Sequence, residues 1–457
     1  MRFSFGEVCD AVGGRPVGQP PSQTLRIVTD TRQIEPGDAF VALRGENFDG
    51  GDFTGDAFAK GAVLAIVTRE DLLAGKPGIV VEDTLRAYMA LGAAARAHSN
   101  GIVIAITGST GKTTTKALLA QLLSFSGKKL AATPQNENNQ VGVSKLLLAL
   151  DGDEQVVVVE MGARHAGEIA ELCAIAMPHL GILTNIGEAH LEVFETRERL
   201  ADTKWGLFST GAIAILNVAD EESRRRFGTL PRAPGWFGAG ETVFANVLLP
   251  ATLIPARDGI VFADAAGYET FSISTSLPGD HNLSNLAAAA TAARAVGMTP
   301  PAIVEAIPKL TLPPGRYERM SLQGGVHLVY DAYNASLSGT LATLRAFSSE
   351  NAERRIAVLG GMAELGVESP QMHEEIGASL PGCGIDVVLI GGEHADSTIR
   401  GAVRAGMSPL AIVPYESNAH ATQWLRVNMR EGDSILLKGS RMYKMEEILG
   451  GLKALRQ

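Results

Sequence analysis

Apolar strands and amphipathic helices alternate along the middle of the chain. Runs of Val, Ile and Leu at Ile102 to Thr107 and Val156 to Glu160 predict buried strands, and Lys112 to Phe125 and Arg197 to Phe208 predict helices. Strands that are apolar on both faces and alternate with helices are typical of a parallel sheet with helices on both sides. We therefore predict a central α/β domain over residues 85–312.

The two ends of the chain predict further domains. The first 84 residues contain short apolar segments, such as Leu25 to Thr29, with Gly and Asp turns between them, which predicts a small α/β domain over residues 1–84. Between residues 242 and 277 the pattern changes to short two-sided strands, which predicts an antiparallel insert or extension. Leu312 to Gly315 interrupts the periodicity and predicts a linker. The alternation then resumes and predicts a doubly wound, Rossmann-like domain over residues 313–457.

Length, composition and charge narrow the class of protein. The 457 residues suffice for roughly three domains of about 150 residues, and 46% apolar against 20% charged residues is typical of a folded globular chain. A net charge of −10 disfavours nucleic acid as a partner. Cys9, Cys173 and Cys383 lie far apart in the sequence, which indicates neither a disulfide framework nor a zinc site. Charged residues near the start, and no apolar run of about 18 residues, lead us to expect a cytoplasmic protein without membrane insertion.

The strongest chemical signal is a glycine-rich loop between a strand and a helix. The loop follows the strand that ends at Thr107 and comprises Gly108, Ser109, Thr110, Gly111, Lys112, Thr113 and Thr114. Such a loop directs backbone N–H groups at phosphate oxygens; Lys112 would reach the β- and γ-phosphates, and Thr113 would ligate Mg²⁺. Ile106 stands where the strict motif has its first glycine, so the match is to a shortened variant. An ordinary glycine turn before a helix is the alternative, which this context disfavours.

Three further residues are candidates for a metal site. Glu160 ends a buried strand and would present a carboxylate at the same sheet edge as the phosphate loop, where Mg²⁺ needs an oxygen ligand. His190 follows the next strand, and Lys204 lies within a predicted helix. From local sequence alone, His190 is more simply a satisfied surface or core residue, and Lys204 a solvated helix residue.

Several motifs together resemble the muramyl ligases, the ATP-dependent amide-forming enzymes that build the peptide of bacterial cell-wall precursors. The resemblance covers nearly the whole chain. It rests on the phosphate loop, Glu160-Met161-Gly162, Asn185 to Leu191, Lys204, Gly279 to Asn285 and Gly315-Arg316. It implies a three-domain α/β fold, with a small N-terminal domain for a uridine nucleotide, a central ATP-binding domain and a C-terminal ligase domain. It also implies a monomer that acts on small molecules.

The resemblance implies roles for individual residues. Lys112, His190 and Lys204 would be catalytic. Lys204 would react with CO₂ to form a carbamate, and Thr113, Glu160, His190 and the carbamate would hold two Mg²⁺ ions. Further contacts to ATP would come from Asn282, Asn285, Arg316, Asp331, Tyr333 and Asn334. The uridine nucleotide would be bound by Thr29, Asp30, Thr31, Arg32, Asn138 and Asn139.

Muramyl ligases add the parts of the precursor peptide in successive steps, and the two ends of the chain indicate which step the resemblance favours. Asp30-Thr31-Arg32 resembles the uridine-nucleotide domain of both the third- and the fourth-step ligases. Asp331 to Ala335, Lys438 to Arg441 and Leu359 to Gly366, with His373 after it, resemble the fourth-step ligase. That enzyme would use ATP to join D-alanyl-D-alanine to UDP-MurNAc-tripeptide through an acyl phosphate. The alternatives are a third-step ligase and, from another class, a P-loop ATPase or GTPase used as a switch or motor.

The chain also departs from the family pattern at three places. Gly51 stands where a His is usual, Ser144 where a Pro is usual, and Ser336 to Gly339 where Asn-Pro-x-Ser is usual. We expect the first two to touch the uridine-nucleotide region and the third to lie beside the adenosine contacts.

Overall fold

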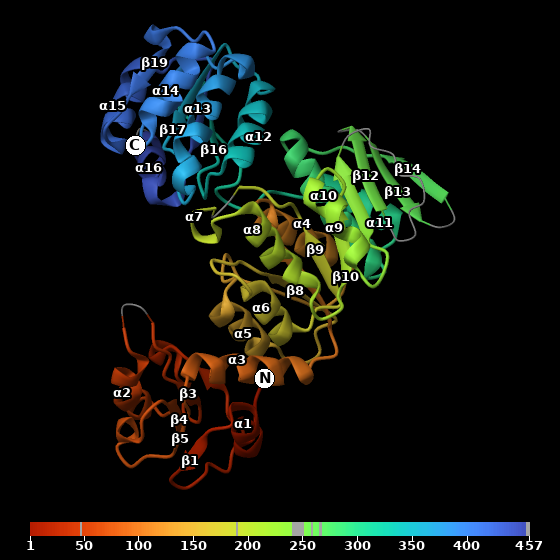
Figure 1. Cartoon of the computed structure of the whole chain (residues 1–457), viewed down its shortest axis with the longest axis vertical. Helices are drawn as coiled ribbons and strands as arrows, with labels where there is room; N and C mark the ends of the chain where they lie inside the picture. The colour runs from red at the N-terminus through yellow and green to blue at the C-terminus, as the bar shows by residue number, and fades with distance from the viewer. Residues whose placement is uncertain (46–47, 189–190, 240–250, 257–258, 265–266, 454–457) are drawn as a thin grey trace.

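The chain forms three β-sheets in succession, each with its own helices (Figure 1). The structure is a computed structural model that describes residues 1–45, 48–188, 191–239, 251–256, 259–264 and 267–453. Within these residues, no helix has the length and apolar character needed to cross a bilayer. The three-domain α/β architecture predicted from the sequence is confirmed.

The N-terminal sheet has five short strands in the order β1-β5-β4-β3-β2, of which only β1 is antiparallel to its neighbour. Its strands are β1 (Arg15–Val17), β2 (Ile27–Val28), β3 (Ala39–Val41), β4 (Leu64–Val67) and β5 (Gly78–Val80). Helices α1 (Phe5–Val12) and α2 (Thr54–Ala59) accompany them. The sheet is connected to the middle domain by α3 (Thr84–Ala97), which packs on two helices of that domain, α5 (Gln140–Ala149) and α6 (Glu168–Ala176).

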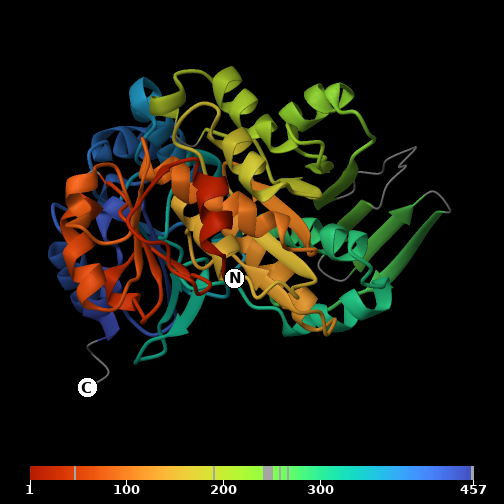
Figure 2. The ribbon, with the colours of Figure 1, turned by 90° about the horizontal axis from the view of Figure 1, so that it is seen from below.

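The middle sheet has nine strands in the order β14-β13-β12-β11-β10-β9-β6-β8-β7. The strands are β6 (Ile102–Thr107), β7 (Leu130–Ala132), β8 (Val156–Glu160), β9 (Leu180–Leu183), β10 (Ile213–Asn217), β11 (Gly235–Ala239), β12 (Ala251–Ala256), β13 (Gly259–Asp264) and β14 (Gly267–Ser272). Pairing is parallel from β7 to β12 and antiparallel from β12 to β14. The antiparallel extension is therefore confirmed, although residues 242–250, 257–258 and 265–266 of the predicted segment lie outside the described residues. Figures 1 and 2 show β13 and β14 projecting on the side away from the C-terminal domain.

Helices cover both faces of the middle sheet because its strands are apolar on both faces. Ile104 and Ile106 of β6 pack with α4 (Lys112–Ser124) and α10 (Gly279–Ala295), whereas Val103 and Ala105 face α5 and α6. The remaining helices are α7 (Leu191–Phe194), α8 (Arg197–Trp205), α9 (Glu221–Arg226) and α11 (Pro300–Ala306). The helix predicted over Arg197 to Phe208 is shorter than expected, since its last three residues form a 3₁₀ turn.

The C-terminal sheet has six strands in the order β15-β16-β20-β17-β18-β19, and all pairs except β15-β16 are parallel. Its strands are β15 (Glu318–Ser321), β16 (His327–Tyr330), β17 (Arg354–Leu359), β18 (Val387–Ile390), β19 (Ile412–Pro414) and β20 (Asp433–Lys438). Its helices are α12 (Leu337–Ser348), α13 (Ser369–Ser379), α14 (Ala395–Arg404), α15 (Asn418–Asn428) and α16 (Glu446–Lys453). The predicted linker at Leu312 to Gly315 lies in the coil before β15, where Gly315 has φ 72°.

Candidate active site

A cavity of about 1180 Å³ is lined by residues of both the middle and the C-terminal domains. Because β6, β8, β9 and β10 are parallel, their carboxyl ends meet at one edge of the middle sheet, and the loops after them reach this cavity. The C-terminal domain contributes residues that follow β16 and β20. The cavity therefore lies where a ligand can contact both domains at once.

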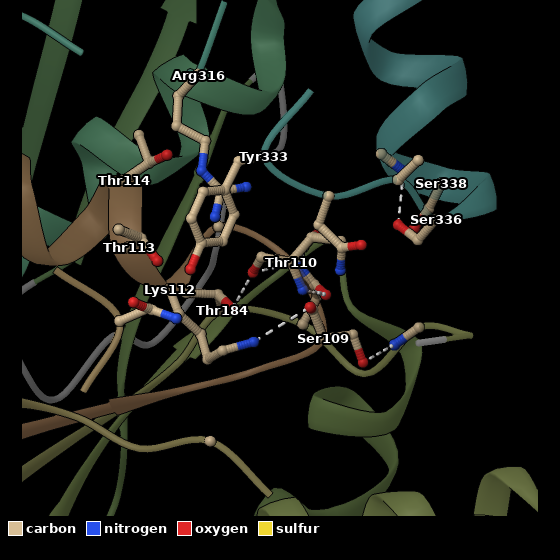
Figure 3. A pocket seen from close by; sticks show the side chains of 18 of the residues that line it. Ser109, Thr110, Lys112, Thr113, Thr114, Thr184, Arg316, Tyr333, Ser336 and Ser338 are labelled. Carbon is tan, nitrogen blue, oxygen red and sulfur yellow. Dashed lines mark hydrogen bonds between the residues drawn. The ribbon is translucent and has the colours of Figure 1, made fainter. Parts of the chain in front are cut away.

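The phosphate loop joins β6 to α4 on one wall of the cavity (Figure 3). Its two glycines have φ 147° at Gly108 and 81° at Gly111, a region that side-chain-bearing residues rarely adopt. A Cβ atom added to Gly108 would lie 1.9 Å from Thr184 Oγ1, and one added to Gly111 would lie 2.3 Å from Asn285 Oδ1. Glycine is therefore required at both positions. A compact loop of this kind at a helix N-terminus fits the phosphates of a nucleotide.

The lysine of the loop is folded back over its own backbone. Lys112 Nζ donates hydrogen bonds to the carbonyl oxygens of Gly108 at 2.6 Å and Ser109 at 3.2 Å. Figure 3 shows the lysine bent back toward Ser109. Burial lowers the pKa of Lys112, an effect that the charge of Glu160 opposes and the charge of Arg316 reinforces. The ammonium is therefore held by the carbonyl oxygens of the loop itself.

The predicted metal residues Glu160 and Thr113 meet at the same wall. Glu160 is 1% exposed, and its Oε1 accepts hydrogen bonds from Thr113 Oγ1 at 3.0 Å and Asn138 Nδ2 at 2.9 Å. Its Oε2 lies 3.0 Å from Lys116 Nζ, an ion pair that was not predicted from the sequence. A carboxylate and a hydroxyl beside a phosphate loop are hard oxygen donors, so the pair fits Mg²⁺.

Lys204 lies in the last turn of α8 and lines the cavity. It is 2% exposed, so its local interpretation as a solvated helix residue is wrong. Burial lowers the pKa of Lys204 well below its usual value, and the neighbouring charge of Lys112 lowers it further. Within the described part of the chain, no carboxylate forms an ion pair with it. His190 lies outside the described residues; nearby Glu188 lines the cavity and pairs with Arg197 at 2.8 Å.

The C-terminal domain brings a buried charge cluster to the opposite wall. Asp331 Oδ2 lies 3.0 Å from Lys438 Nζ and accepts a hydrogen bond from Thr343 Oγ1. Burial alone would raise the pKa of Asp331, but Lys438, Thr343 and Arg316 together lower it, so the carboxylate is charged. The Arg316 guanidinium stacks on the Tyr333 ring at 4.2 Å from its centroid (Figure 3).

Most other predicted nucleotide residues also line the cavity, namely Ser109, Thr110, Thr114, Asn282, Asn285 and Asn334. Asn282 and Asn285 come from the first turns of α10. Asn334 contacts the charge cluster, because its carbonyl oxygen accepts a hydrogen bond from Lys438 Nζ at 2.9 Å. The structure thus brings residues between positions 109 and 334 together around one cavity.

The predicted uridine-nucleotide residues fall into two groups. Asn138 and Asn139 line the cavity, whereas Thr29, Asp30, Thr31 and Arg32 belong to the N-terminal domain and are not part of its lining. Arg32 is 86% exposed, and its guanidinium pairs with Asp30 at 2.7 Å. This hydrogen-bonded pairing lowers the pKa of Asp30 to about 2.

The three departures from the family pattern lie in different surroundings. Ser144 is buried between α5 and α3, where a Cβ atom added to Gly92 would lie 2.9 Å from Ser144 Cβ, so it packs two helices and does not line the cavity. Gly51 is buried beside Leu72. Ser336 caps α12 by accepting a hydrogen bond from Gly339 N at 3.3 Å, and this turn lies against the phosphate loop near Thr110.

Comparison with models of known protein families shows to which family the chain belongs. It matches the Mur ligase family, catalytic domain, over residues 26–113, the Mur ligase middle domain over 106–293, and the Mur ligase, glutamate ligase domain over 315–441. The chain therefore belongs to the Mur ligase family.

Its relatives within that family point to one member. UDP-N-acetylmuramoyl-tripeptide–D-alanyl-D-alanine ligase from Escherichia coli (strain K12) is 34% identical over 433 residues, which cover 93% of each chain. Among solved structures, MurF from Acinetobacter baumannii has a TM-score of 0.87 at 30% identity and covers 99% of both chains. MurF ligase from Thermotoga maritima, in complex with ADP, has a TM-score of 0.80 at 29% identity and covers 94% of this chain and 97% of that one.

Proposed function

We propose that this chain is an ATP-dependent ligase that joins D-alanyl-D-alanine to UDP-MurNAc-tripeptide and forms UDP-MurNAc-pentapeptide for peptidoglycan synthesis. The observation that carries the proposal is the shared cavity. It combines a phosphate loop and the buried Glu160 and Thr113 on one wall with the charged cluster of Asp331 and Lys438 on the other. Similarity over nearly the full length to ligases of that name supports the same reaction.

The chemistry explains why such a cavity needs a phosphate loop. A carboxylate is a poor acyl donor, because oxide is a poor leaving group. A carboxylate oxygen of the tripeptide therefore attacks the γ-phosphorus of ATP, and ADP leaves. The amine of D-alanyl-D-alanine then attacks the carbonyl carbon of the acyl phosphate, loses a proton, and phosphate leaves with the former carboxylate oxygen.

The chain's own residues would stabilise the charge that develops in both steps. Lys112 and the N–H groups of its loop would face the transferring phosphoryl group, where fixed donors contribute most. Arg316 would add positive charge from the C-terminal domain, and Asn282 and Asn285 would help to hold the nucleotide. Because these groups come from two domains, the cavity orients the reactants only when both domains are in place.

Magnesium would be held by residues of the middle domain. Thr113 and Glu160 would hold one ion, and His190 with a carbamylated Lys204 would hold a second. When bound, Mg²⁺ would neutralise charge on the phosphoryl oxygens.

The surroundings of Lys204 support its conversion to a carbamate. Its lowered pKa favours the neutral amine, which is the form that attacks CO₂. A bond forms between Nζ and the carbon of CO₂, a proton is released, and the product is an anion. The reaction replaces a cation that would repel Mg²⁺ by an oxygen donor that would bind it.

The remaining elements of the proposal concern the substrate and its location. Thr29, Asp30, Thr31 and Arg32 would bind the uridine nucleotide from the N-terminal domain, with Asn138 and Asn139 contacting its peptide-bearing end. Every group named here comes from one chain, so we propose that a monomer suffices. We propose a cytoplasmic location, because the reaction would draw on ATP and nucleotide-linked substrates.

The test is phosphate release from ATP with UDP-MurNAc-tripeptide and a panel of single amines. The proposal predicts rapid release with D-alanyl-D-alanine and background release with diaminopimelate or lysine. Rapid release with diaminopimelate alone, on the shorter UDP-MurNAc-dipeptide, would instead identify a third-step ligase. Hydrolysis that needs neither an acceptor nor an amine would identify a P-loop ATPase.

A further inference from the structure

A second lysine of the phosphate-binding helix contacts the proposed metal carboxylate. Lys116 lies three residues after Thr113 on α4 and is 6% exposed. Its Nζ lies 3.0 Å from Glu160 Oε2, on the opposite carboxylate oxygen from the one that Thr113 and Asn138 contact. Glu160 is therefore neutralised from within the protein, by a partner that is itself buried.

The same ammonium also holds the loop that carries the substrate asparagines. Lys116 Nζ donates a hydrogen bond to the carbonyl oxygen of Gln135, a residue with φ 40°. Three residues later, Asn138 contacts Glu160 through its side chain and accepts a hydrogen bond from Gly162 N at 2.8 Å. Lys116 thus connects the phosphate-binding helix, the end of β8 and the loop from Gln135 to Asn139.

We propose that Lys116 is a positioning residue that acts as the internal counter-ion of Glu160. It holds the carboxylate and the Gln135–Asn139 loop in place before a divalent ion binds, and it competes with that ion for Glu160 Oε2. The proposal rests on the assignment of Glu160 as a metal ligand in the proposed function.

The physical reason is the cost of an unpaired buried charge. A carboxylate without a charged partner in the interior loses much of its hydration, and removal of one partner of a buried pair is strongly destabilising. A fixed ammonium 3.0 Å from the carboxylate offsets that loss when no metal is present. The same positive charge repels an arriving divalent cation, so the cation binds less tightly than it would to Glu160 alone.

Two measurements on the full chain test the proposal, with K116M as the main variant and K116Q as a second uncharged variant. The first is Mn²⁺ binding in the presence of saturating ADP, followed by the electron paramagnetic resonance signal of free Mn²⁺. Both variants should bind Mn²⁺ about tenfold more tightly than the wild type, because the competing charge is gone. The matched control is K309M, which removes an exposed lysine that pairs with exposed Glu305 at 3.6 Å and should leave Mn²⁺ affinity unchanged. Equal or weaker Mn²⁺ binding in the folded K116 variants would overturn the proposal.

The second measurement is a melting cycle without metal. K116M should lower the melting temperature by several degrees in the wild-type background and by less than half as much in E160Q, where no carboxylate is left unpaired. Equal losses in the two backgrounds would overturn the counter-ion role. If E160Q bound Mn²⁺ with ADP as tightly as the wild type, the metal assignment of the proposed function would fail, whereas the melting cycle would still decide the ion pair.

Discussion

Replacing Lys204 by Met should stabilise the protein while abolishing ligation. Lys204 is buried, and the part of the chain described here offers no carboxylate as its ion-pair partner. Its folded-state pKa lies well below the unfolded value of about 10.4, so the folded state binds fewer protons than the unfolded state between those two values. Each pH unit in that window therefore costs the wild type about 1.4 kcal/mol of folding stability as pH falls. Met has a similar length and carries no such cost.

The assay is urea unfolding of the wild type and K204M in buffer freed of CO₂, at several pH values from 7.5 to 10.5. The free energy of unfolding should be larger for K204M at pH 8, and the excess should shrink by about 1.4 kcal/mol for each pH unit within that window as pH rises. At pH 10.5 only about 0.3 kcal/mol should remain, because the folded-state lysine is neutral and roughly half of the unfolded-state lysine is. Bicarbonate should then change the stability of the wild type but not that of K204M. Parallel pH dependence of the two proteins would refute the reasoning, because the Lys204 ammonium would then be as well solvated in the folded state as in the unfolded chain.

Three further changes test other parts of the site. K112A should lower kcat by about 10²-fold or more with an unchanged melting temperature, because it removes a positive charge from developing phosphoryl charge; single-turnover kinetics should show the loss in the chemical step, and near-normal turnover would exclude Lys112. R32A should raise KM for the uridine nucleotide far more than KM for ATP, since Arg32 is exposed and remote from the cavity lining; equal rises measured in steady-state assays would argue against a separate uridine-nucleotide domain. D331N should lower the melting temperature by several degrees because it leaves buried Lys438 without its counter-ion; thermal unfolding should show that K438M in the D331N background restores part of the loss, and no recovery would contradict the pairing.

Much of the fold could be predicted because its parallel sheets leave a strong sequence signal. Strands buried on both faces read as continuous apolar runs, so β6 and β8 have the predicted bounds. The strands of the N-terminal domain were harder to predict. Strands of two to four residues, such as β2, are too short to show an alternation of apolar and polar positions. Helix α1 was not named for a similar reason: its eight residues give only about two turns of pattern.

The candidate site could be predicted where residues are close in sequence, and less well where folding brings them together. The phosphate loop is contiguous, so its residues were found directly. Lys116 was missed because a lysine within a helix ordinarily lies on the solvated face, and its partner Glu160 is distant in the sequence. The pairing depends on β8 lying beside β6, a neighbour relation that the order of strands along the chain does not reveal.

Lys204, in contrast to Lys116, was predicted as a site residue. The prediction came from the resemblance to the muramyl ligases and not from its local sequence. Helix α8 is rich in polar residues, and Lys204 is buried only because the helix packs within the middle domain. Burial, not residue type, is what lowers the pKa of the amine and supports its reaction with CO₂.

The central step of the proposed reaction is the formation of an acyl phosphate from the tripeptide and ATP. Its most direct test uses UDP-MurNAc-tripeptide labelled with ¹⁸O in its terminal carboxylate, together with ATP and D-alanyl-D-alanine, and mass spectrometry of the released phosphate. If the acyl phosphate forms, each phosphate molecule released from a labelled tripeptide should carry one ¹⁸O atom, because a carboxylate oxygen leaves bonded to phosphorus. Unlabelled phosphate released together with new pentapeptide would contradict it.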